Sequence, residues 1–173
     1  LILLAGNSPK NKPRIQKVQT ELKEFFDQSY LHDYQHWQLG YPNMDFEEEI
    51  DVLYNQIKND KDIVIFAKSL GTILALMLLA EKGIHPSKCI FVGFPMGYVD
   101  SNEFPLHYYI GKDICPILFI QKTKDPACNF QELKKIFSEF SPKFQFQEVA
   151  GLDHDYENIQ ELKTLIKKFI LNK

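Results

Sequence analysis

The chain has 173 residues, of which 45% are hydrophobic and 25% charged, a composition typical of a single soluble globular domain spanning residues 1–173. The net charge is −3, from 20 basic and 23 acidic residues, and no basic block or stripe is present, which disfavours nucleic acid as a partner. No apolar stretch reaches the roughly 18 residues that a membrane-spanning helix requires, so no membrane association is predicted.

The three cysteines, Cys89, Cys115 and Cys128, cannot all pair with one another. Two of them begin apolar runs, where a free cysteine behaves as a small buried hydrophobic residue. Free thiols are typical of a reducing compartment, so we expect a cytoplasmic protein. The cysteines and histidines lack the spacing of a metal site, and no metal is predicted. Because the chain opens on a strand-like run at Leu1 and not on Met, we expect a few residues upstream.

Strand-like and helix-like segments alternate along the chain, which predicts an α/β fold. We expect a doubly wound, mostly parallel sheet of about six strands with helices on both faces and ligands at the carboxyl ends of the strands. The predicted strands are 1–5, 30–38, 63–66, 88–94, 114–121 and 143–149. The predicted helices are 13–26, 46–57, 70–79, 130–140 and 156–171, and an irregular aromatic segment is expected at 95–112.

The most informative pattern lies at residues 62–79, where a buried strand is followed by a tight turn and an apolar helix. Ser69 lies at the turn, with Ala67 two residues before it and Gly71 two residues after it. Small residues at these positions let the backbones pass closely, as in a nucleophile elbow, where a strand-to-helix turn presents a serine hydroxyl above the sheet. The alternative is an ordinary serine at the start of a helix.

A nucleophile at Ser69 requires an acid after a later strand and a histidine after the last strand. Asp125 directly follows the strand 114–121, and His154 lies between the last strand and the last helix. In this interpretation His154 accepts the proton of Ser69, and Asp125 holds the imidazole in the productive tautomer. Asp125 could instead be a turn residue before a proline, and Asp100 is the alternative acid.

The developing oxyanion requires backbone donors close to the serine. The predicted donors are the N–H of Leu70, the residue after the nucleophile, and the N–H of Asn7, in the loop after the first strand. Lys68, next to the serine, is expected to be solvated. The aromatic segment 95–112 is a candidate substrate wall, or alternatively a cover for the sheet; its predicted substrate contacts are Met96, Tyr98 and Tyr108.

The stretches LILLAGNSP, AKSLGT, QKTKDP and GLDHDY make the whole chain resemble the α/β-hydrolase superfamily. It is most similar to the small, cap-less serine hydrolases of the retinoblastoma-binding-protein and dienelactone-hydrolase types. The resemblance implies a minimal fold without a lid domain, a Ser69–Asp125–His154 triad and no cofactor. Ala67 departs from the motif, which has Gly at this position in its stricter form.

The expected function is that of a serine hydrolase of the carboxylesterase type. It would cleave a small ester or related acyl compound through an acyl-enzyme intermediate. Thioesters and amides are not distinguished, because their hydrolysis uses the same triad and oxyanion hole. The alternative is a binding module with little or no turnover, in which the surface of segment 95–112 contacts a protein partner.

Overall fold

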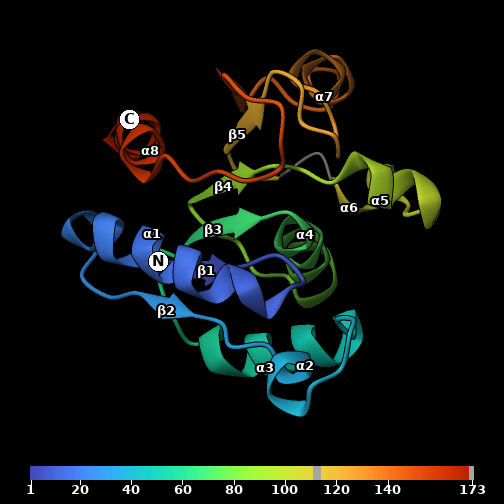
Figure 1. Cartoon of the computed structure of the whole chain (residues 1–173). Coiled ribbons are helices and arrows are strands. Elements are labelled where there is room, and N and C mark those ends of the chain that lie inside the picture. Colours follow the sequence, from blue (N-terminus) through green and yellow to red (C-terminus); the bar gives the residue numbers. More distant parts are fainter. Residues whose placement is uncertain (111–113, 172–173) are drawn as a thin grey trace.

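The computed structural model describes residues 1–110 and 114–171. Its centre is a six-stranded sheet in the order β2-β1-β3-β4-β5-β6, and every neighbouring pair is parallel (Figure 1). The predicted doubly wound α/β fold is therefore confirmed. The strands are β1 (Ile2–Leu4), β2 (Tyr30–Leu31), β3 (Val64–Lys68), β4 (Lys88–Val92), β5 (Ile117–Lys122) and β6 (Phe144–Val149).

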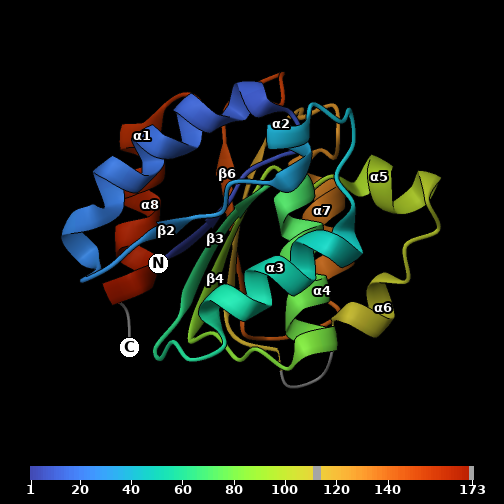
Figure 2. The same ribbon diagram turned by 90° about the horizontal axis from the view of Figure 1, so that it is seen from below.

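Helices cover both faces of the sheet, as Figure 2 shows. One face carries α1 (Lys12–Leu22) and α8 (Ile159–Leu171). The other carries α3 (Phe46–Ile57), α4 (Leu70–Lys82) and α7 (Phe130–Phe137). The shorter helices are α2 (Gln35–Leu39), α5 (Met96–Ser101) and α6 (Leu106–Tyr109), with 3₁₀ turns at Pro9–Asn11 and Lys23–Phe25. Among the described residues we find no separate lid domain and no helix long and apolar enough to cross a membrane.

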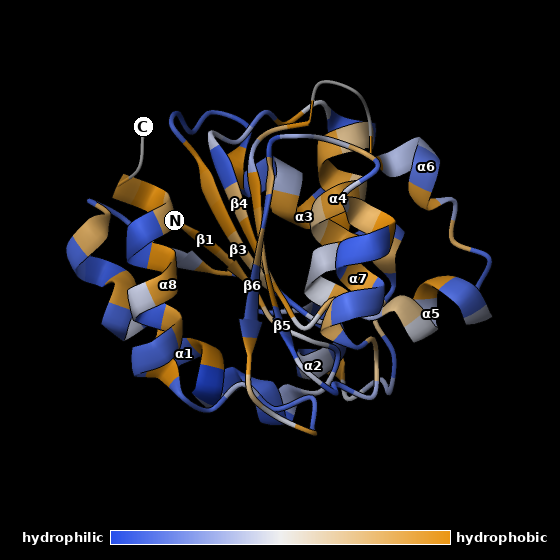
Figure 3. Cartoon of the chain, turned by 90° about the horizontal axis from the view of Figure 1, so that it is seen from above, coloured by the Kyte–Doolittle hydropathy of each residue, from blue (hydrophilic) through white to orange (hydrophobic). Residues whose placement is uncertain are grey.

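The central strands and α4 form the core, visible as the orange band of Figure 3. All five residues of β3 are buried, because helices pack on both of its faces. The first turn of α4 lies directly on β1. A Cβ atom on Gly71 would lie 2.6 Å from the carbonyl oxygens of Leu4 and Ala5, so only glycine allows this approach. The close contact brings the start of α4 to the carboxyl end of the sheet.

Two segments differ most from the prediction. The expected strand 30–38 is wrong beyond Leu31, because α2 occupies residues 35–39 and ends at Gly40, whose φ is 75°. The alternation of aromatic residues in this segment is typical of a strand, but Tyr34 and His36 are both buried at the start of α2. The segment 95–112, expected to be irregular, contains α5 and α6, and its residues 111–112 lie outside the described residues.

Candidate functional site

Ser69 lies between β3 and α4 in a backbone conformation that few L-residues adopt, with φ 52° and ψ −127°. Such a conformation costs about 1–3 kcal/mol and is typical of functional sites. The backbone N–H of Ser69 donates to the carbonyl oxygen of Val92 at 3.0 Å, and its own carbonyl accepts from the N–H and the hydroxyl of Thr72. These bonds hold the sharp turn that sets the serine hydroxyl at the carboxyl end of β3.

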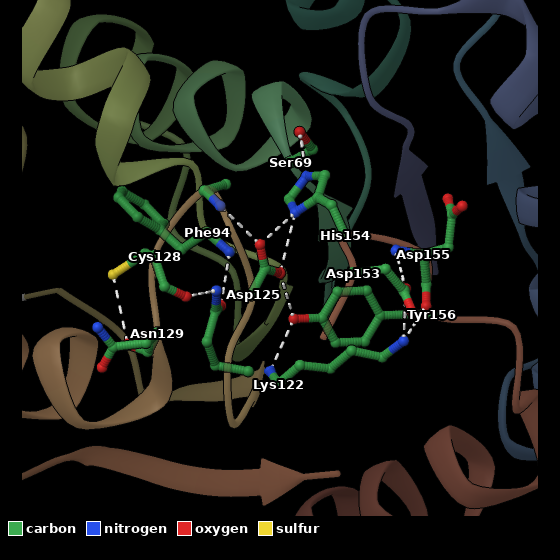
Figure 4. Close-up of polar contacts among 12 residues, drawn as sticks. Ser69, Phe94, Lys122, Asp125, Cys128, Asn129, Asp153, His154, Asp155 and Tyr156 are labelled. Atoms are coloured by element: carbon green, nitrogen blue, oxygen red, sulfur yellow. Dashed lines mark hydrogen bonds and ion pairs between the residues drawn. The ribbon is translucent and has the colours of Figure 1, made fainter. Parts of the chain in front are cut away.

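A continuous hydrogen-bonded chain links this serine to two other residues (Figure 4). His154 Nε2 lies 2.9 Å from Ser69 Oγ, and His154 Nδ1 lies 2.9 Å from both carboxylate oxygens of Asp125. The structure thus brings together the three residues of the predicted triad from three separate loops. Asp100, the alternative acid, is exposed on α5 and is not part of this hydrogen-bonded network.

Asp125 is almost fully buried, with 3% of its surface exposed. Burial alone would raise the pKa of this carboxyl, but hydrogen bonds from His154, the Ala127 N–H and the Tyr156 hydroxyl outweigh it and lower the pKa. The Ala127 and Tyr156 bonds are each 2.8 Å long. The carboxylate therefore stays ionised beside the imidazole.

Tyr156 is a component of the site that the sequence analysis missed. Its hydroxyl donates to Asp125 and accepts the backbone N–H of Lys122 at 2.9 Å. Burial, followed by the charge of Asp125, raises the pKa of this phenol, so it remains a protonated donor. Its position two residues after His154, in the loop that follows the last strand, is a signal that could have found it.

Both predicted oxyanion donors have free backbone N–H groups. Leu70 is the first residue of α4, so its N–H has no acceptor one turn earlier within the helix. The N–H of Asn7 makes no hydrogen bond in the described part of the chain. The neighbouring Gly6 lies directly against the serine, since a Cβ on Gly6 would be 3.2 Å from Ser69 Cβ. Within the described residues, the N–H groups of Leu70 and Asn7 are thus both left without an acceptor.

Lys68 is buried, with 7% of its surface exposed, so the expectation of a solvated lysine is wrong. Its side chain lines a cavity of about 20 Å³ together with Asn11, Arg14 and Tyr156, and it has no hydrogen bond or ion pair within the described residues. Burial, and secondarily the charge of Arg14, lowers the pKa of Lys68 to about 8. Sequence reasoning could not foresee this, because α1 and α8 cover the lysine from distant parts of the chain.

The three predicted substrate contacts do not lie together in the structure. Met96 and Tyr98 lie on α5, directly after the carboxyl end of β4, and the Gly97 N–H ties this helix to the carbonyl of Ala127 at 3.0 Å. Tyr98 is half-buried and packs against Phe46, with 5.9 Å between ring centroids.

Tyr108 is not brought to Ser69, which corrects that prediction. It lies on α6 beside the last turn of α4, where its neighbour Tyr109 donates to Glu81 at 2.7 Å. Tyr108 lines an open groove of about 550 Å³ with residues that precede β4 and β5. The physical reason is that the two strands are parallel, so the chain must return to the amino end of the sheet before β5 begins.

Several solved structures share the fold. An uncharacterized protein from Bacillus cereus aligns with 99% of this chain at 20% identity and a TM-score of 0.75, although this chain spans only 59% of that protein. An alpha-beta serine hydrolase homologue from Coxiella burnetii has a TM-score of 0.69 at 16% identity, covering 97% of this chain and 83% of its own. Est1E from Butyrivibrio proteoclasticus, with ferulic acid bound, has a TM-score of 0.71 at 14% identity, with coverages of 98% and 87%.

No match to the chain was found among the curated proteins. A family model, by contrast, matches residues 24–170, a range that runs from the turn after α1 to the last turn of α8 and includes Ser69, Asp125 and His154. The model describes the alpha/beta hydrolase domain. Because the match extends over most of the chain and agrees with the observed sheet, this protein belongs to the alpha/beta hydrolase family.

Proposed function

We propose that the protein is a serine hydrolase of the carboxylesterase type that cleaves a small ester or related acyl compound. The observation that carries the proposal is the hydrogen-bonded chain from Ser69 Oγ through His154 to Asp125, with 2.9 Å at each step. Membership of the alpha/beta hydrolase family supports hydrolytic chemistry. The strained backbone of Ser69 and the free N–H groups of Leu70 and Asn7 support covalent catalysis at the serine.

The proposed reaction has two halves. Ser69 Oγ gives its proton to His154 Nε2 and forms a bond to the acyl carbon, while the carbonyl oxygen becomes an oxyanion held by the N–H groups of Leu70 and Asn7. His154 then protonates the leaving alcohol, and the acyl group stays on the serine. Water gives a proton to His154 and attacks the acyl carbon of this acyl-enzyme. The bond from the acyl carbon to Ser69 Oγ then breaks, His154 returns the proton to Ser69, and the acid leaves. Asp125 stays ionised and stabilises the imidazolium in both halves. The chain's own residues carry every proton, so the proposal includes no cofactor.

The proposed substrate wall is the part of α5 that holds Met96 and Tyr98, now without Tyr108. Its apolar and aromatic character favours a small acyl or aromatic ester over a highly charged compound. The three cysteines are free in the structure, which supports a cytoplasmic location as part of the proposal.

Hydrolysis of p-nitrophenyl acetate and butyrate by wild type and Ser69→Ala tests the proposal. The matched control is Ser138→Ala, a serine that directly follows the last residue of α7. We expect Ser69→Ala to lower kcat by up to about 10⁶-fold and the control to match wild type. Equal rates for Ser69→Ala and wild type would contradict the proposal. A folded but inactive wild type would favour the alternative of a protein-binding module on the same scaffold.

A further inference from the structure

Three ionisable side chains form a buried cluster between β2, α2 and α3. His32, His36 and Glu49 are 0%, 4% and 1% exposed. Glu49 accepts from His32 Nε2 at 2.8 Å and from the Gln35 N–H at 2.7 Å. A buried carboxylate is costly, and an apolar group in its place is often as stable, so stability alone gives little reason to keep such a cluster.

The cluster is connected to Asn7, one of the two oxyanion donors. His36 Nε2 donates to the Asn7 carbonyl at 2.8 Å, and Trp37 Nε1 donates to the same oxygen at 2.6 Å. These bonds fill both lone pairs of the carbonyl. The side chain of Asn7 is also held, since it accepts from the Met44 N–H and donates to the Pro42 carbonyl, each at 2.9 Å. Within the described part of the chain, every polar group of Asn7 is thus bonded except its N–H.

The same contacts show which ring nitrogen of His36 donates a hydrogen bond. Because Nε2 donates to a carbonyl, it must carry a proton. Nδ1 then lies 3.5 Å from a Glu49 oxygen and makes no hydrogen bond. The imidazole therefore lies between the Glu49 carboxylate and the Asn7 carbonyl, and its hydrogen bond within the described residues is the one to the carbonyl.

We propose that His36 is a positioning residue for the oxyanion hole. It fixes the Asn7 backbone so that the free N–H lies where the oxyanion forms, next to Ser69. The inference rests on the proposed hydrolase function and extends it to residues that do not touch substrate. Gly6 packs directly on Ser69, so a shift of this loop changes the donor geometry at once. A misplacement of about 1 Å at a catalytic centre can cost about 100-fold in rate.

Paired substitutions at His36 separate positioning from simple structural support. In His36→Gln the side-chain amide can place an N–H close to the former Nε2, whereas His36→Leu removes the donor. We expect His36→Leu to lower kcat by about 10- to 100-fold with KM changed less than about threefold, because the lost interaction acts on the transition state. His36→Gln should recover most of that loss. The exposed His85→Leu is the matched control and should behave as wild type.

A proton NMR signal verifies that the triad itself is unchanged. The low-field resonance of the His154 Nδ1 proton should have the same shift in wild type and His36→Leu. If His36→Leu does not fold, Trp37→Phe can be measured in its place. This variant removes the other donor to the Asn7 carbonyl and should also lower kcat.

The outcomes distinguish this inference from the proposed function. A wild type that hydrolyses esters, together with a folded His36→Leu of unchanged kcat, overturns the positioning role alone. Equal losses in His36→Gln and His36→Leu, or a shifted His154 resonance, also overturn it. An inactive wild type overturns both proposals.

Discussion

Replacing Lys68 by methionine should stabilise the protein at neutral pH, because this side chain is largely buried and has no hydrogen bond or ion pair within the described residues. The pKa of Lys68 is lowered from 10.5 to about 8. At about 1.36 kcal/mol per pKa unit, burying the charged form costs about 3 kcal/mol. Methionine has a similar length and no charge, so Lys68→Met should remove this cost.

The pH dependence follows from the sign of the pKa change. Between about pH 8 and 10.5 the unfolded state binds more protons at Lys68 than the folded state, so the free energy of unfolding of wild type rises with pH in this window. At pH 7 nearly the full cost is present, and by pH 10 about 2.5 kcal/mol of it has disappeared. The advantage of Lys68→Met over wild type should therefore be large at pH 7 and small at pH 10.

Urea unfolding of both proteins at the two pH values measures this advantage. The other ionisable groups are the same in wild type and variant. Their effect on the free energy of unfolding therefore cancels when the two proteins are compared at one pH. An equal difference at pH 7 and pH 10, or a wild type more stable than Lys68→Met at pH 7, would show that the charge of Lys68 does not destabilise the folded protein.

Other predictions concern the triad and its supports. Asp125→Asn should lower kcat about 10⁴-fold, whereas Asp100→Asn should leave ester hydrolysis unchanged; the reverse would reassign the acid. Tyr156→Phe removes a hydrogen bond to a carboxylate worth about 1.5 kcal/mol and should lower kcat/KM about tenfold in the same assay. Gly71→Ala should lower the free energy of unfolding by more than about 3 kcal/mol, because the added Cβ would lie 2.6 Å from backbone oxygens. Thermal unfolding measures this loss. Gly97→Ala is the control, since that Cβ meets only one atom at 3.8 Å.

The positions of Ser69, Asp125 and His154 could be predicted because each lies in a loop directly after a strand. In a parallel sheet these loops meet at one edge, so the order of strands and helices is enough to place the three side chains together. The Ser69 turn added a local signal, since the small Gly71 marks a close approach of helix and strand.

The environment of these residues could not be predicted in the same way. The burial of Lys68 depends on α1 and α8, which approach β3 from opposite ends of the chain. The contacts of His36 with Asn7 and Glu49 join segments separated by many residues, and the alternating aromatics around His36 imitated a strand. Tyr108 was misplaced because composition does not show where a crossover segment turns back toward the amino end of the sheet.

The most direct test of the proposed mechanism is intact-mass labelling with a fluorophosphonate probe, which reacts with activated serines. We expect one adduct on wild type, mapped to Ser69 by peptide analysis and absent from Ser69→Ala and His154→Ala. The absence of an adduct on folded wild type, or an adduct that persists in Ser69→Ala, would contradict the proposed mechanism.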